Sequence, residues 1–140
     1  METLCAFVRE KTQTPKRKES PSTDDEDEPQ FEPPDTDVQA AVTVIGKCSE
    51  ERRNQEGKRL NLRGAHLEKA NLPKTNFNGA NFAEAHLAGA QLWEADLESA
   101  FFAEAHLEEA SLQKAHLKGA QFRQAHLEEA WLPEAYLKGA

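Results

Sequence analysis

The sequence predicts an all-β fold in which residues 60–140 coil into a four-sided parallel β-helix of about four coils. Leu or Phe stands at every fifth position from Leu62 to Leu137, which makes sixteen positions, twelve Leu and four Phe. The positions two before these residues belong to a second series of spacing five, and fifteen of its seventeen members from Leu60 to Ala140 are Ala, the exceptions being Leu60 and Thr75. Similar residues also return every twenty positions.

A period of five cannot bury these apolar side chains in a straight element. Five residues advance an α-helix by about 500°, so the leucines would be scattered around its axis. Side chains of a straight strand alternate with a period of two, so successive leucines would face opposite sides. A short extended piece followed by a turn instead places both the Ala and the Leu inward. Gly two positions after the central residue, as at Gly64 and Gly89, and Pro one position after it, as at Pro73 and Pro133, suit such turns.

The twenty-residue echo sets the number of sides. His stands just before the central Leu at 66, 86, 106 and 126, and the central residue is Phe at 82, 102 and 122. Because twenty residues make four pentapeptides, one coil has four sides. Similar residues then stack in columns about 4.8 Å apart, the spacing of strands in a sheet.

This pattern resembles that of the pentapeptide-repeat family, A-(D/N)-L-x-x, and the resemblance covers residues 60–140 in register without a gap. It implies a right-handed quadrilateral β-helix. The position before the central Leu carries the expected Asn or Asp only at 61, 71, 76, 81 and 96. The other residues at this position are His, Gln, Phe, Ser, Trp and Tyr. They should point outward, so we expect no effect on the fold.

The N-terminal part is similar to that of a group of bacterial pentapeptide-repeat proteins of unassigned function. The similarity lies in METLCAFVRE, in DVQAAVTVIG at 37–46 and in the arginine-containing segment that follows. In that group a membrane-spanning stretch commonly precedes the part that matches Met1, and this sequence has none. The chain is then either a soluble variant or truncated at its start.

Three segments are expected. Residues 1–36 combine a short helix near the start with a disordered linker that is rich in proline and charge. Residues 37–59 begin with a helix over 37–46, in which Asp37 is the expected N-cap and Gly46 the expected stop, followed by a charged connector. Its Val/Ile face should cap the first coil. Residues 60–140 form the β-helix.

Composition excludes several classes of function. The net charge is −8, and each half of the chain carries −4 of it, which disfavours direct nucleic-acid binding. No stretch approaches the roughly 20 apolar residues that a membrane span needs. The only cysteines, Cys5 and Cys48, have neither disulfide-framework nor metal-site spacing. We therefore expect a cytoplasmic protein.

The histidines in register are the most specific candidate site. His106 and Glu108 should point outward from one side, and His126 with Glu128 repeats this pair one coil further along. Imidazole and carboxylate together are Zn²⁺ ligands. The alternative is a solvated ladder, or a pH-sensitive stripe, produced by repeat duplication. Because an exposed ladder lacks surrounding groups that fix metal ligands, we expect no resident metal and no cofactor.

Four aromatic residues occupy outward positions and are candidate contact residues: Trp93, Phe101, Trp131 and Tyr136. Trp93 and Phe101 have a second interpretation, as residues packed beneath the N-terminal segment. Trp131 and Tyr136 fall in the last coil, which no capping helix follows in this sequence. We therefore expect a homodimer formed through the C-terminal coil.

The sequence contains no nucleophile–base arrangement and no glycine-rich phosphate loop. It predicts a non-enzymatic structural or protein-interaction module that presents flat faces to an unknown protein partner. Two alternatives are a surface metal-binding His/Glu ladder and a DNA-mimic inhibitor of an enzyme such as gyrase. The resemblance implies the second, because some members of the family resemble duplex DNA in width and charge.

Overall fold

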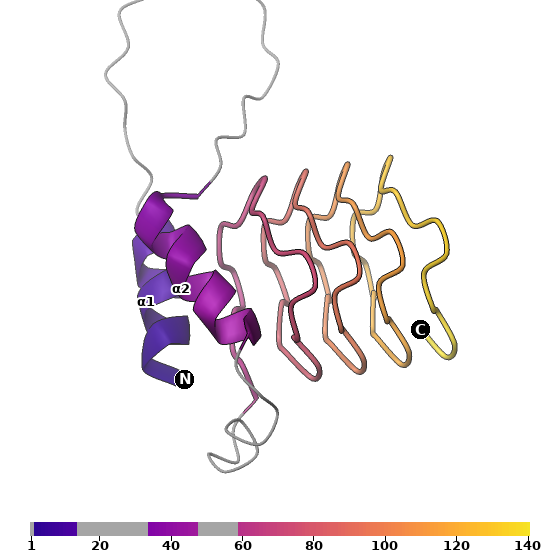
Figure 1. The fold of residues 1–140 in the computed structure, drawn as a ribbon, viewed down its shortest axis with the longest axis horizontal. Helices are drawn as coiled ribbons and strands as arrows, with labels where there is room; N and C mark the ends of the chain where they lie inside the picture. Colours follow the sequence, from indigo (N-terminus) through magenta and orange to yellow (C-terminus); the bar gives the residue numbers. More distant parts are fainter. Residues whose placement is uncertain (1, 14–33, 48–58) are drawn as a thin grey trace, which may run out of the picture.

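The computed structural model describes residues 2–13, 34–47 and 59–140. Helices α1 (Glu2–Gln13) and α2 (Thr36–Lys47) lie against one end of a stack of coils that residues 59–140 form (Figure 1). Most of the linker predicted within residues 1–36 and of the charged connector predicted within residues 37–59 lies outside the described residues. Neither helix has the length and apolar character that a membrane span requires.

Each side of a coil pairs in parallel with the side twenty residues later. The residue before each central Leu or Phe forms the bridge, as in Asn61 with Asn81 and His66 with His86. The amide of His86 donates to Ala65 O at 2.9 Å, and the amide of Leu87 donates to His106 O at 2.7 Å. This register confirms the parallel β-helix and its four sides. Each side contributes one bridge residue rather than an extended strand, and the two helices make the described chain less than all-β.

A β-turn closes every pentapeptide. The amide of Ala90 donates to Leu87 O at 2.9 Å, and the same three-residue bond recurs along the coils. The second turn residue has a positive φ throughout. In eleven repeats this residue is not Gly, and its φ lies between 54° and 58°. Such a conformation costs an L-residue on the order of 1–2 kcal/mol, so the bonds and burial of each coil must offset it.

The core fills the bore of the coil. Every inward Ala, Leu and Phe from Leu60 to Ala120 is buried, as predicted. Phe82, Phe102 and Phe122 stack with ring centroids 5.2 and 5.0 Å apart. In the last coil Phe122, Leu127 and Leu132 are only partly buried, and Leu137 is 47% exposed.

The cap contains both helices. The apolar face of α2, Val38, Ala41, Val42 and Ile45, joins the same core as Leu60 and Leu62, as predicted. Helix α1 adds Cys5 and Val8 to that core, with Leu4 and Phe7 packed against it. The sequence indicated only a short, marginal helix here, because the apolar spacing of α1 is weak without the surface that it covers.

Two expected boundaries of α2 are wrong. The helix begins at Thr36, and Asp35 O accepts the first helical bond from the amide of Gln39 at 2.8 Å, so Asp35 and not Asp37 occupies the cap position. Gly46 does not stop the helix, which continues to Lys47. Its role is close approach, because a Cβ there would lie 2.7 Å from Thr75 Cβ and 2.9 Å from Phe77 Cζ.

Helix α2 substitutes for a preceding coil. The side-chain amide of Gln39 pairs with the backbone of Asn71, accepting from its N–H at 2.8 Å and donating to its O at 2.7 Å. The amide of Asn76 donates to Gly46 O at 2.6 Å. These bonds satisfy backbone groups that an earlier coil would otherwise pair with, so the cap protects this sheet edge by hydrogen bonding as well as by apolar packing.

Gly46→Ala tests this docking. The added methyl group must displace Thr75 or Phe77, so we expect the free energy of unfolding to fall by about 1–3 kcal/mol in denaturant titrations. Val44→Ala is the matched control, because Val44 is 52% exposed on the same helix and should change stability by less than about 0.5 kcal/mol. A Gly46→Ala variant as stable as the wild type would contradict the close contact.

Candidate functional site

The four histidines of one side form a stacked column, the histidine column: His66, His86, His106 and His126. The 20-residue register places one imidazole directly above the next. The ring centroids of successive pairs are 4.2, 4.8 and 4.7 Å apart, and their planes lie within 17° of parallel. The backbone therefore fixes the spacing of these side chains.

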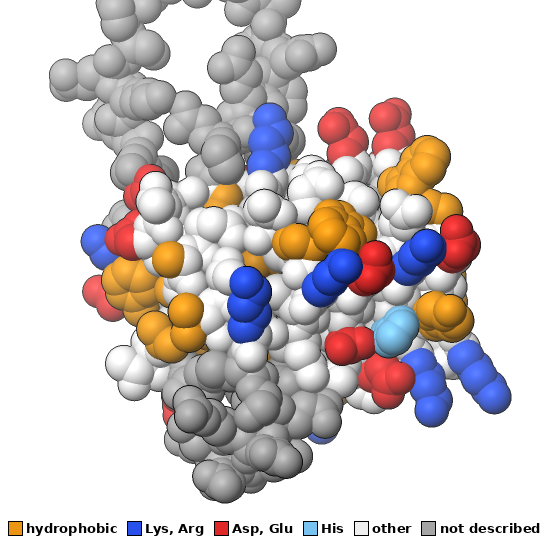
Figure 2. All heavy atoms as spheres, viewed as in Figure 1, with side chains coloured by type: hydrophobic (Ala, Val, Ile, Leu, Met, Phe, Trp, Pro, Cys, Tyr) orange, Lys and Arg blue, Asp and Glu red, His pale blue; other side chains and the backbone are white. Residues whose placement is uncertain are grey.

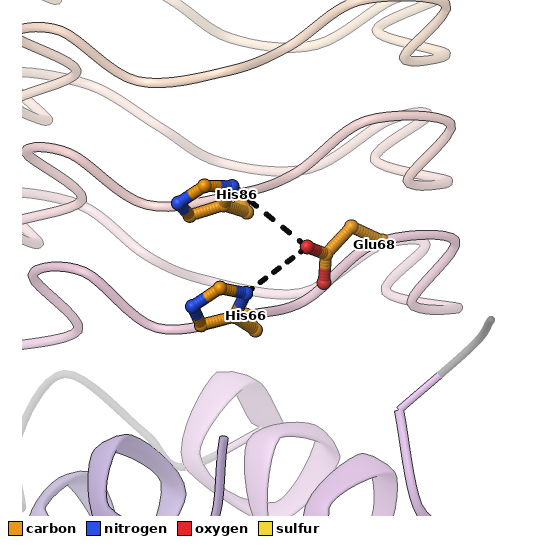
Figure 3. Close-up of side chains that lie close together, drawn as sticks. All are labelled: His66, Glu68 and His86. Atoms are coloured by element: carbon orange, nitrogen blue, oxygen red, sulfur yellow. Dashed lines mark hydrogen bonds and ion pairs between the residues drawn. The ribbon is translucent and has the colours of Figure 1, made fainter. Parts of the chain in front are cut away.

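Glutamates on the adjoining turn reach back to the column. Glu68 Oε1 lies 3.2 Å from Nδ1 of His66 and 3.8 Å from Nδ1 of His86, so one carboxylate addresses two rings (Figure 3). Glu108 Oε1 lies 2.9 Å from Nδ1 of His106. The equivalent position in the intervening coil is Ala88, which is buried at 4% exposure. The column therefore has a carboxylate at its first and third coils but not at its second.

Only three of the four predicted candidate metal ligands lie close together. His106, Glu108 and His126 offer ligand atoms within 4.8 Å of one another, whereas Glu128 approaches only His126, at 3.6 Å, and is exposed. A second triad, His66, Glu68 and His86, has the same compactness and was not among the candidate residues. The same His-x-Glu spacing is visible in the sequence at residues 66–68.

Two groups of the histidine column and its glutamates, His86 and Glu108, have pKa values below the ordinary ones. Burial, then the neighbouring charge of His66, lowers the pKa of His86 below 6.5, although Glu68 acts against it. Burial alone would raise the pKa of Glu108. The hydrogen bond from His106 and the bond from its own backbone amide, together with the charges of His106 and His126, outweigh burial and lower this pKa below 4.5. Both shifts favour the deprotonated forms.

The outward aromatics fall into two pairs. Phe101 lies under Arg59, whose guanidinium carbon is 4.9 Å from the ring centroid, and Trp93 lies under the amine of Lys74 at 5.2 Å. Both rings are half-buried. Trp131 and Tyr136 in the last coil are 64% and 62% exposed. Figure 2 shows hydrophobic side chains on the surface at this end of the stack, at the right of the view.

The repeats also match a known sequence family. The family model described as pentapeptide repeats (8 copies) matches this chain twice, at residues 61–98 and at residues 92–128. The chain belongs to the pentapeptide-repeat family. Family membership implies the right-handed sense expected for the coil. No curated protein matches the chain.

Several solved structures of pentapeptide-repeat proteins are similar to this chain. One from the cyanobacterium Cyanothece 51142 is 33% identical over 54% of this chain and 48% of its own, with a TM-score of 0.40. One from the thylakoid lumen of Arabidopsis thaliana is 30% identical over 56% and 52%, with a TM-score of 0.44. HetL, involved in heterocyst differentiation regulation in the cyanobacterium Nostoc, is 26% identical over 57% and 48%, with a TM-score of 0.36. The chain spans about half the length of these proteins.

The two pKa shifts predict that acid destabilises the fold. Because both groups are deprotonated more readily when folded, the unfolded chain binds more protons as the pH falls below 6.5 for His86 and below 4.5 for Glu108. The stability they contribute is complete above these values and is lost as the pH falls through the lower, folded-state pKa values. Denaturant unfolding in the presence of a chelator should show this decline.

His86→Asn should flatten the part of that decline that begins near pH 6.5, because it removes the titrating ring and keeps a residue that the repeat accepts. Gln91→Asn is the control, since it introduces Asn at the equivalent position of the neighbouring side without removing a titrating group. Identical pH profiles for His86→Asn and the wild type would refute a role for His86.

Proposed function

We propose that this protein is a non-enzymatic interaction module that binds a protein partner through the outer surface of its last coil. The observation that carries the proposal is the exposure of Trp131 and Tyr136, at 64% and 62%. Buried Leu, Phe and Ala fill the bore of the first three coils, so the chemistry available to a partner lies on outward positions.

The two exposed aromatics lie on adjoining sides. Trp131 pairs with Ser111 on one side and Tyr136 with His116 on the next, with Pro133 and Glu134 in the turn between them. Trp and Tyr are enriched at the centres of protein interfaces, where a rigid ring excludes water at small entropic cost. The patch therefore has the composition of a contact surface.

A second copy of this chain is the partner that we propose. Leu137 is 47% exposed, and Phe122, Leu127 and Leu132 of the same coil are only partly buried. Two such coils brought together would bury these side chains on both chains at once, as a self-complementary two-fold interface does. The exposed apolar area of the last coil is thus the physical reason for association.

The surface gives little support to the DNA-mimic alternative. Arg63, Lys74 and Lys114 each form an ion pair with a glutamate of the next coil: Glu84, Glu94 and Glu134. On one edge of the stack Lys74, Glu94, Lys114 and Glu134 therefore alternate in charge, and on another edge Arg63 places a positive charge beside Glu84. A duplex mimic needs a continuous negative surface, because phosphates recur along both DNA strands.

Trp131→Ala/Tyr136→Ala should shift the protein from dimer to monomer, because it removes the two most exposed aromatic side chains of the patch. Size-exclusion chromatography with light scattering measures this, with a shift of at least tenfold in the dimer dissociation constant, or about 1.4 kcal/mol. Gln91→Ala/Ser111→Ala changes outward residues on the same side as Trp131 and should leave the dimer intact. A monomeric wild type at all concentrations would remove the second copy as the partner.

A further inference from the structure

We propose that the histidine column holds two binding sites for Zn²⁺ or a similar divalent transition-metal ion. The first site consists of His66, Glu68 and His86, and the second of His106, Glu108 and His126. Each triad offers two imidazole nitrogens and one carboxylate oxygen within 4.8 Å of one another. Such mixed N/O ligation suits Zn²⁺, Ni²⁺ or Cu²⁺ better than Mg²⁺ or Ca²⁺, which prefer all-oxygen ligands.

The distances match what a tetrahedral ion requires. Ligand atoms that each lie about 2.0–2.1 Å from Zn²⁺ are separated by roughly 3.3 Å at the tetrahedral angle. The separations from Glu68 Oε1 to Nδ1 of His66 and His86 are 3.2 and 3.8 Å, and that from Glu108 Oε1 to Nδ1 of His106 is 2.9 Å. These values bracket the required one, so an ion needs only small side-chain movements.

The paired rings must tilt slightly toward each other. Their centroids are 4.2 Å apart in the first site and 4.7 Å apart in the second, both longer than the roughly 3.3 Å that two tetrahedral ligands span. A rotation about the Cβ–Cγ bond brings the nitrogens together without moving the backbone. The closer stacking of His66 and His86 makes the first site the better formed of the two.

Carboxylate placement decides which histidines pair. Glu68 serves the first and second rings, and Glu108 follows the third, while Ala88 gives the second coil no carboxylate. His86 and His106 are stacked at 4.8 Å, much like the other pairs. Stacking alone does not distinguish the pairing of His86 with His106 from that of His106 with His126, at 4.8 and 4.7 Å, so the glutamates divide the column into two sites.

The environment of the glutamates supports a cation there. The Glu68 side chain is only 14% exposed. Glu108 Oε2 is buried and accepts no hydrogen bond from any other described residue. A buried carboxylate oxygen without a partner carries a free-energy cost that a bound cation would relieve.

Binding replaces a proton by an ion. Nδ1 and the carboxylate oxygen now lie within hydrogen-bonding distance in His106–Glu108, and a metal bound between them displaces the proton that they share. Three protein ligands leave a fourth tetrahedral position, which faces solvent and is filled by water or by a group from a partner.

Isothermal titration calorimetry of the full chain with ZnCl₂ tests the proposal, with Co²⁺ absorption as an independent report of tetrahedral ligation. The wild type should bind two ions per chain. His66→Asn/His86→Asn and His106→Asn/His126→Asn should each bind one, and the quadruple variant none. Asn is the residue at Asn61 and Asn81, equivalent positions of the neighbouring side, so these variants should fold, and their unfolding midpoints check this. His116→Asn, a histidine outside the column, should still bind two.

His66→Asn/His126→Asn discriminates between the pairings. It keeps His86 and His106 stacked but breaks both proposed triads, so we expect no saturable Zn²⁺ uptake. Retention of one tight ion by this variant would overturn the assignment of the two sites. Less than one ion bound by the wild type, or undiminished uptake by the quadruple variant, would overturn the proposal itself. The dimer of the proposed function involves other residues, so its measurement is separate from this result.

Discussion

The structure depends on one constraint: each side of a coil forms its backbone hydrogen bonds with the side twenty residues away. Between successive coils the amide of the central Leu or Phe donates to the following coil and the amide before it donates to the preceding coil, as with Leu87 and His86. This pairing requires exactly four turns between partners, and each turn requires a left-handed residue. The small inward Ala follows from the same geometry, because side chains from four directions must share one narrow bore. The columns, including the histidine column, are consequences of this register.

The register also explains why Asn is suited to the position before the central residue. The backbone amide of the first residue in each turn forms no hydrogen bond with the backbone of a neighbouring coil. Asn61 and Asn81 accept from these amides at Arg63 and Ala83, at 3.2 and 3.0 Å. Pro73, at the same position of its turn, has no N–H group and so needs no such acceptor. At Ala88 in the histidine column that bond is absent, and the Ala88 amide donates to no described residue. The loss of this bond is a local cost that stacking and the glutamates must offset.

The sequence predicted the repeated part of the fold well because its pattern is local and periodic. The five-residue and twenty-residue spacings directly encode the turn, the inward face and the number of sides. The cap was harder to predict. Gln39 pairs with Asn71, and Gly46 packs against Thr75, but neither contact leaves a periodic signal in the sequence. Helix α1 was underestimated for the same reason, since its buried face is defined only by the coil that it covers.

The candidate site was only partly predictable. The spacing indicated that histidines would stack and that glutamates would adjoin them, but it could not show that Glu68 addresses two rings or that Glu108 has a buried, unpaired oxygen. These features depend on side-chain packing between successive turns, which residue spacing alone does not describe. Lys69 occupies the space above Gly89, as its Cγ would lie 3.2 Å from a Cβ placed there.

The measurement that tests the register most directly is scalar coupling through hydrogen bonds, observed by NMR between an amide nitrogen and the carbonyl carbon that accepts from it. The account predicts couplings from Leu87 to His106, from Leu92 to Ser111 and from Phe102 to Gln121. It also predicts none from the amides of Ala88, Trp93 and Ala103. Couplings from the amides of Leu87, Leu92 and Phe102 to any other carbonyl, or from these turn amides, would contradict a coil of four pentapeptide sides.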